Sequence, residues 1–240
     1  MGYSLVLPFH SDLTSLPATV ARAREEGGGH GVREVLLAHN GRPLTDEERA
    51  RVEALVAPAV DGKPEVRSLD TTSKGIGAGY KLGIKHAREE FVILSADDLP
   101  FGWSDVDAFE AVGRPDFAIG SKAHRDSKLP RGKRALSREI STFGFLQLRR
   151  LLLGAGTPGD SQGTLILRTP LAQSLLPDLV YDHYLASLEL ATLHLKRGGR
   201  IVEVPIVWQE APHQSSVSVL RDGMRMAREL VDLRRRMKSL

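Results

Sequence analysis

The chain has 240 residues, of which 41% are hydrophobic and 26% are charged, as is ordinary for a globular protein. It contains no cysteine, which excludes a disulfide framework and any thiolate nucleophile or metal ligand. The net charge is +3, the sequence pI is about 9.3, and no apolar run approaches the ~20 residues of a membrane span. We therefore expect a cytoplasmic protein without a secretion signal, whose mildly basic character favours a phosphate-bearing partner.

Short apolar segments rich in branched residues predict strands in the first half of the chain. They lie at 4–9, 34–39, 66–69, 91–95 and 116–120. Their length and their continuous apolar character are typical of strands buried on both faces of a sheet. Another such segment, at 200–208, predicts a late strand.

Helical segments separate these strands. Ser11 or Asp12 is placed to cap the first helix, and Thr45 with Glu48 forms a capping-box pattern at the start of the second. Two further helices are predicted at 75–88 and from 104 onward. This alternation predicts an α/β fold with a mostly parallel sheet, whose ligands bind at the carboxyl ends of the strands.

Basic residues gather after residue 120. The segment 121–138 carries Lys122, Arg125, Lys128, Arg131, Lys133, Arg134 and Arg138. Two interpretations stay open for it, a solvated helix face and an anion-binding site. The C-terminal segment 220–238 spaces apolar residues as a helix does, among many Arg and Lys. It predicts an amphipathic basic helix that either packs on the domain or lies on anionic lipid.

Two adjacent acids, Asp97 and Asp98, follow the fourth predicted strand in the stretch FVILSADDLPF. Neighbouring carboxylates at the end of a strand repel each other and need compensation. Taken alone, such a pair before Leu-Pro is typical of a turn or a helix cap. A divalent cation would also offset the repulsion, because Mg²⁺ and Mn²⁺ prefer oxygen ligands.

The order of several motifs resembles glycosyltransferase family 2. LVLPFHSDLTSLPATVARA resembles the opening strand and helix of that family, and SKGIGAGYKLGIKHAREEFVILSADDLP resembles its glycine-rich turn, helix and acidic strand end. The match continues in order through IGSKAHRDS, GDSQGTLILRTPLAQSLLP, RGGRIVEVPIVWQE and LRDGMRMARELVDL, and covers nearly the whole chain. The most similar branch is that of the dolichyl-phosphate and polyprenyl-phosphate sugar synthases.

The resemblance implies a GT-A fold in a single domain at 1–240. Its nucleotide-binding half would be 1–120, and its acceptor-binding half, 121–240, would end in the basic helix. The implied activity is an inverting hexosyl transfer from a nucleotide-diphosphate sugar, with Mg²⁺ or Mn²⁺ as cofactor. The implied acceptor is a polyprenyl phosphate or a small molecule. We expect no nucleic-acid partner, and docking to the inner face of an anionic membrane follows from a lipid acceptor.

Site residues are carried over by position. The resemblance implies that the nucleotide is bound by Pro8, Phe9, Asp12, His39, Asn40, Lys74, Gly75, Gly77 and Asp97. The implied metal ligands are Asp98 and Asp97, and the catalytic carboxylates are Asp97, Asp98 and Glu189. An acceptor phosphate would meet Lys122, Lys133, Ser137 and His213. An acceptor hydroxyl would instead need a base, for which the candidates are Asp160, Asp182 and Glu189.

The chain departs from the family pattern at several positions. His39 to Arg42 replaces the usual Asp-Asp-Gly-Ser turn, and one acid of the DxD motif is missing in either register. Ile76 replaces a lysine, and Ser187 replaces one acid of the late pair. Three hypotheses therefore remain: a metal-dependent glycosyltransferase, a nucleotidyltransferase, and a non-catalytic module that binds a nucleotide sugar or anionic lipid.

Overall fold

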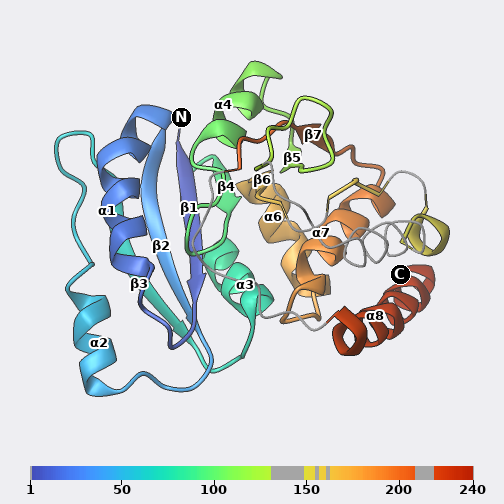
Figure 1. The fold of residues 1–240 in the computed structure, drawn as a ribbon, viewed down its shortest axis with the longest axis horizontal. Helices are drawn as coiled ribbons and strands as arrows, with labels where there is room; N and C mark the ends of the chain where they lie inside the picture. The colour runs from blue at the N-terminus through green and yellow to red at the C-terminus, as the bar shows by residue number, and fades with distance from the viewer. Residues whose placement is uncertain (1, 131–148, 155–156, 161–162, 209–218, 240) are drawn as a thin grey trace.

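The computed structural model describes residues 2–130, 149–154, 157–160, 163–208 and 219–239 (Figure 1). Three of the predicted acceptor residues, Lys133, Ser137 and His213, lie outside these ranges.

The described strands form one seven-stranded sheet of order β3-β2-β1-β4-β6-β5-β7. Their bounds are β1 Tyr3–Phe9, β2 Val32–Asn40, β3 Glu65–Thr71, β4 Phe91–Leu94, β5 Phe117–Gly120, β6 Leu165–Arg168 and β7 Val202–Val204. The prediction of a mostly parallel sheet is confirmed, because β6 alone among them pairs antiparallel with its neighbours, β4 and β5. Strands from both predicted halves of the chain therefore lie in one sheet.

Helices cover both faces of this sheet (Figure 1). Their bounds are α1 Leu16–Glu26, η1 Gly27–His30, α2 Asp46–Glu53, α3 Ile76–His86, α4 Ser104–Ala111, α6 Thr169–Leu175, η2 Leu176–Asp178, α7 Leu185–Lys196 and α8 Val219–Ser239. A short helical stretch also occupies 149–153. Apolar residues of α1, α2 and α4 pack on one face, and those of α3, α6, α7 and α8 pack on the other.

The first strand shows why the apolar runs predict buried strands. Leu5 and Leu7 face the core under α1 and α4, whereas Val6 faces the core under α3 and α7. Each of these side chains is buried, so a continuous apolar sequence is needed. The prediction is wrong for β3, which forms the edge of the sheet and is mostly half-buried or exposed.

The predicted cap of the first helix is wrong, and the predicted cap of the second helix is confirmed. The first helix begins at Leu16, and neither Ser11 nor Asp12 caps it. Asp12 instead accepts a hydrogen bond from the Thr14 amide at 2.9 Å, a local turn that competes with helix formation. The capping box of Thr45 and Glu48 is present as predicted, with both reciprocal hydrogen bonds formed.

The predicted C-terminal amphipathic helix is present as α8. Leu230 and Leu233 are buried in the core cluster that includes α7, whereas Arg228 and Arg235 on the other side of the helix are exposed. The helix thus packs on the domain and turns basic residues outward. In the described part of the chain, no helix is both long enough and apolar enough to span a bilayer.

Candidate active site

The predicted acidic pair lies in a turn directly after β4, at the edge of the sheet where the parallel strands end. The next residue, Leu99, has φ 45°, a left-handed backbone conformation that branched residues rarely adopt. Its side chain is buried in the core, which holds the turn in this conformation. Strained backbone of this kind is concentrated at functional sites, so the turn is the starting point for the site.

The carboxyl group of Asp97 sits in an electrostatically unfavourable place. Its pKa is raised, first because burial disfavours the ionised form and then because Asp98 and Asp12 place negative charge nearby. The Ser15 hydroxyl partly offsets this by donating a hydrogen bond to Oδ2 at 3.3 Å. A bound cation would offset these effects, because a nearby positive charge favours the ionised carboxylate.

The donor set around the turn fits a metal shared with a ligand. In the described ranges, no group of three or more His, Asp or Glu side chains converges to hold an ion. A closed protein cage is therefore absent from that part of the chain. Mg²⁺ is usually held by one or two carboxylates together with substrate phosphates and water, which is what Asp97 and Asp98 leave room for.

Several residues predicted to meet the nucleotide instead form the floor of this edge. Pro8 is buried beneath α3. A Cβ added to Gly79 of that helix would lie only 2.6 Å from the Cβ of Pro8. Phe9 is also buried, and its ring centroid lies 5.3 Å from that of His39. These two side chains present little surface to a ligand, so the structure gives them a packing role.

Asn40 connects three segments at this edge. It is buried, its Nδ2 donates to the Phe9 carbonyl at 2.9 Å, and its Oδ1 accepts from the Gly75 amide at 3.1 Å. It therefore fixes the end of β1 against the start of α3. Asn40 thus has a positioning role, and its direct contact with a nucleotide stays a prediction.

The two predicted glycines of the α3 turn serve a close packing contact. Gly75 has φ 122°, and a Cβ on it would clash with the backbone carbonyl of Asp182. A Cβ on Gly77 would clash with Ala186. Glycine is required because the segment before α7 lies against the start of α3. The chain itself approaches both glycines closely, and their predicted contact with a nucleotide stays a prediction.

Basic side chains gather where the family pattern has acids. The pKa of His10 is lowered, first by burial and then by the charges of Lys74, His39 and Arg42. His39 pairs through Nδ1 with Asp70, the residue beside it on β3. The predicted nucleotide residues Lys74 and His39 therefore both lie near His10, and Asp70 is bonded to His39. The sequence did not single out His10 or Asp70.

A pocket of about 150 Å³ adjoins the acidic turn. It is lined by Ile76, Tyr80, Ala96, Pro100, Phe101, Gly163, Thr164, Tyr184 and Ser187. Three of these belong to the acidic turn itself, whereas Thr164 precedes β6 and Tyr184 precedes α7. Sequence reasoning missed Thr164 and Tyr184, because no motif marks them and only the packing of the later segments brings them here.

Lys122, predicted to meet an acceptor phosphate, lies beside this pocket. Its Nζ is 5.7 Å from the ring centroid of Phe101 and 5.0 Å from that of Trp208. It is also 3.5 Å from Oδ2 of Asp160, which accepts the Lys122 amide at 3.0 Å. Asp160 is only 8% exposed, so this carboxylate is engaged in holding the lysine.

Glu189 lies away from this constellation, in the packing between α7 and α8. It is 0% exposed and accepts hydrogen bonds from the amides of Val180 and Tyr181. It also forms an ion pair with Arg236 of α8. Burial raises its pKa, and these hydrogen bonds counteract the rise. With no exposed oxygen to offer a substrate, Glu189 has a structural role in place of the predicted catalytic one.

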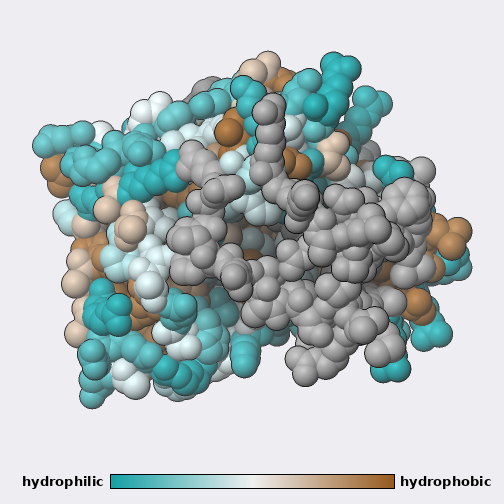
Figure 2. All heavy atoms as spheres, viewed as in Figure 1, coloured by the Kyte–Doolittle hydropathy of each residue, from teal (hydrophilic) through white to brown (hydrophobic). Residues whose placement is uncertain are grey.

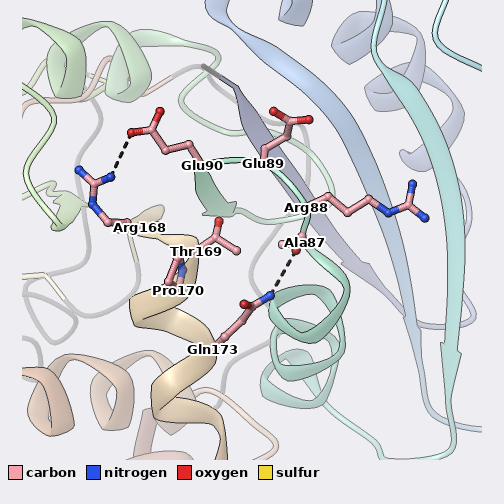
Figure 3. A pocket seen from close by; sticks show the side chains of 8 residues that line it. All are labelled: Ala87, Arg88, Glu89, Glu90, Arg168, Thr169, Pro170 and Gln173. Atoms are coloured by element: carbon pink, nitrogen blue, oxygen red, sulfur yellow. Dashed lines mark hydrogen bonds and ion pairs between the residues drawn. The ribbon is translucent and has the colours of Figure 1, made fainter.

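A second hollow, of about 310 Å³, lies at the other end of the strands, where β4 begins and the antiparallel β6 ends (Figure 3). Glu90 points across it to Arg168, with 3.0 Å between Oε1 and Nη1, and Gln173 donates to the Ala87 carbonyl at 3.2 Å (Figure 3). Ligands of parallel α/β sheets bind at the other edge, so this hollow is separate from the candidate site.

Comparison with known proteins places this geometry in context. No protein-family model matches the chain. A dolichyl-phosphate beta-glucosyltransferase of Saccharomyces cerevisiae is 25% identical over 176 residues, which are 68% of this chain and 52% of that protein. The match thus spans about half the length of this relative.

Solved structures are similar over nearly the whole chain. Glucosyl-3-phosphoglycerate synthase from Mycobacterium tuberculosis, in complex with UDP, has a TM-score of 0.62 at 16% identity, covering 99% of this chain and 80% of that one. Mannosyl-3-phosphoglycerate synthase from Rubrobacter xylanophilus has a TM-score of 0.59 at 14% identity, covering 100% and 75%. With the sheet described above, these findings confirm that the chain has the GT-A fold and that it resembles glycosyltransferase family 2.

Proposed function

We propose that this chain transfers a sugar from a nucleotide-diphosphate sugar to the phosphate group of an acceptor, with a polyprenyl phosphate as the first candidate. The observation that carries the proposal is the state of the three carboxylates predicted as bases for a hydroxyl acceptor. Asp160 holds Lys122, Asp182 is paired with Lys81, and Glu189 is buried with Arg236. A phosphate acceptor needs no such base, because it is already ionised at neutral pH.

The acceptor phosphate would bind at Lys122. The ammonium group of this residue stands beside Phe101, a wall of the pocket next to the acidic turn. A phosphate oxygen held there would attack the anomeric carbon of the donor sugar. The bond from that carbon to the diphosphate oxygen would break, and the nucleoside diphosphate would leave on the opposite side. Such an in-line displacement inverts the anomeric centre, and its rate depends on positioning.

The leaving diphosphate needs charge stabilisation at the acidic turn. Asp97 and Asp98 would hold a Mg²⁺ or Mn²⁺ ion there, which supplies positive charge to the departing phosphates. The unfavourable environment of Asp97 supports this, since a cation would stabilise its ionised form.

The known proteins support a phosphate-bearing acceptor of one of two kinds. The curated relative is named for dolichyl phosphate, a lipid phosphate. One structure of the mycobacterial synthase, with a TM-score of 0.62 at 16% identity, holds Mn²⁺, UDP and phosphoglyceric acid. A polyprenyl phosphate is the first candidate because the relative's sequence matches at higher identity than the structural neighbours do.

A lipid acceptor requires that the molecule reach a membrane surface. The outward side of α8 carries exposed Arg228, Arg235 and Lys238. Hydrophobic atoms reach the surface at the right-hand edge of Figure 2, where Figure 1 draws the end of α8 and the stretch 149–153. Leu151 in that stretch is 76% exposed. We propose docking to anionic lipid, to which each basic residue near the surface contributes about 1 kcal/mol.

Transfer assays with matched acceptors test the function. The protein is incubated with Mn²⁺, a panel of nucleotide sugars, and polyprenyl phosphate, polyprenol or phosphoglyceric acid. Glycosylation of polyprenyl phosphate, with nucleoside diphosphate released and polyprenol unreactive, is expected. Transfer to phosphoglyceric acid alone would change the acceptor class, and pyrophosphate release would indicate a nucleotidyltransferase. Donor binding without turnover would leave a binding module.

Liposome sedimentation tests the docking separately. Binding to anionic vesicles should fall as salt is added, because salt screens the basic face of α8. Equal sedimentation with neutral and anionic vesicles would contradict it.

A further inference from the structure

The row of residues across the ends of β1, β2 and β3 contains an unusual pair. His39 lies between Phe9 on β1 and Asp70 on β3, and its Nδ1 is hydrogen bonded to the Asp70 carboxylate. The family pattern has an acid in the turn that begins here, and this chain has none at His39 to Arg42. Asp70 on the neighbouring strand β3 therefore supplies a carboxylate near the place of the missing one, and the imidazole ring of His39 is bonded to it.

The other ring nitrogen of His39 is left without a partner. The residue is 1% exposed, and its Nε2 is buried with no hydrogen-bond partner among the described residues. Buried polar atoms are nearly always hydrogen bonded, so an orphaned one beside a ligand site points to the ligand as the partner. The position is at the carboxyl ends of the strands, where nucleotides bind in sheets of this kind.

The pairing with Asp70 determines what Nε2 can do. An ionised carboxylate only accepts hydrogen bonds, so the ring hydrogen of a neutral His39 must be on Nδ1. Nε2 then carries a lone pair and acts as an acceptor.

We propose that Asp70 and His39 together read the base of the donor nucleotide, with Nε2 of His39 accepting a hydrogen bond from a ring N–H. This rests on the proposed function and names the donor class. Uracil, thymine and guanine have a ring N–H on their pairing edge. Cytosine and adenine have a bare ring nitrogen there, which would set two lone pairs against each other. The donor is therefore a uridine, thymidine or guanosine diphosphate sugar.

Because Nε2 is buried in this structure, a base reaches it only after neighbouring groups have shifted. The His10 ring lies against Gly41, so closely that a Cβ there would clash with it, and its Nδ1 pairs with the neighbouring Ser11 hydroxyl at 2.8 Å. His10 is half-buried and belongs to the loop after β1. His10 is close enough to His39 for the charge of His39 to affect its pKa.

Direct binding of nucleoside diphosphates tests this pair without any sugar transfer. UDP and CDP are the matched probes, because their bases differ at the pairing edge and are otherwise alike. Calorimetric titration in the presence of Mn²⁺ should show UDP or GDP binding at least about tenfold more tightly than CDP and ADP, since an unmatched buried polar group costs much affinity.

Two variants and a control assign the effect. His39→Phe keeps a ring against Phe9 but has no nitrogen acceptor. This variant should therefore bind UDP and CDP about equally tightly. The amide of Asp70→Asn can donate to Nδ1, which permits the tautomer of His39 with its hydrogen on Nε2. This variant should therefore reduce the preference for UDP over CDP. The control is Asp107→Asn, because His30 and Asp107 form a surface pair at 2.7 Å that is remote from this edge. That variant should keep the preference of the parent.

The outcomes separate this inference from the proposed function. A parent protein that binds CDP as tightly as UDP, or a His39→Phe variant that keeps the full preference, overturns the inference while sugar transfer can still stand. A parent that binds no nucleoside diphosphate overturns both. Thermal unfolding of each variant, compared with the parent, shows whether a lost preference reflects a lost fold.

Discussion

A buried acid next to the candidate pocket makes stability depend on pH in a direction opposite to the usual one. Asp105, in the first turn of α4, is 3% exposed, and burial raises the pKa of its carboxyl from 3.8 to about 6. Its Oδ1 accepts the Val106 amide at 2.9 Å, and a hydrogen bond with the Thr164 side chain partly counteracts the rise. The ionised form is thus disfavoured in the folded protein.

This pKa determines how the contribution of Asp105 to the free energy of unfolding changes with pH. The folded protein binds the proton more tightly than the unfolded chain, so the contribution of Asp105 to stability is complete below pH 3.8 and is lost as the pH rises through about 6. A rise of about two units corresponds to about 3 kcal/mol at pH 8. Asp105→Asn removes the charge, keeps an acceptor for Val106, and can donate to Thr164. We expect it to raise the free energy of unfolding by up to that amount at pH 8 and to change it little at pH 4.

Urea denaturation of the parent and Asp105→Asn at five pH values between 4 and 8 measures this difference. The control is Asp46→Asn, which removes an exposed acid from the first turn of α2. It should lower stability by about 0.3–1 kcal/mol at neutral pH, because acids are favourable at a helix start. An Asp105→Asn protein that is less stable than the parent at pH 8, or a difference that does not change with pH, would refute the reasoning.

Three further predictions concern the site and its support. Lys122→Met should raise the KM for a phosphate acceptor about tenfold or more and leave donor affinity unchanged, as initial rates and nucleotide titration can show; an unchanged KM would remove Lys122 from acceptor binding. Asp97→Asn and Asp98→Asn should each be tested for loss of the Mn²⁺-dependent thermal shift given by nucleoside diphosphates, and retention of the full shift in both would contradict the metal site. Glu189→Gln should lower stability by about 3 kcal/mol, because it removes the negative charge that pairs with Arg236, and Glu189→Gln with Arg236→Met should recover part of that loss in denaturant unfolding.

Much of the fold could be predicted because burial leaves a direct trace in sequence. Strands β1, β2, β4 and β5 were predicted within two residues at either end, since each contains a continuous apolar run. The strand β6 was missed because LILR is a short run directly followed by a helix, and periodicity cannot distinguish these two states. The order of the sheet could not be read either, because it depends on contacts between distant segments.

In the candidate site too, residues marked by motifs could be found from the sequence, whereas the surroundings set by packing could not. Asp97, Asp98 and Lys122, whose roles stay proposals, could be singled out because motif positions carry over with the order of the segments. Glu189 could not be judged, since only the packing of α8 shows that its carboxylate is enclosed. The same holds for the contact of Asn40 with Gly75, which places a predicted ligand-binding side chain inside the protein.

The reversed direction of β6 decides which connection can shape the acceptor side. Because this strand runs against β4 and β5, the chain enters it at the edge where β4 ends, and Gly163 and Thr164 arrive there from the segment that follows β5. On the proposed function, acceptor preference can therefore diverge through changes in that one long connection, while the first four strands and the proposed donor contacts stay as they are. Grafting the connection between β5 and β6 from a relative would be the most economical way to redirect the chemistry.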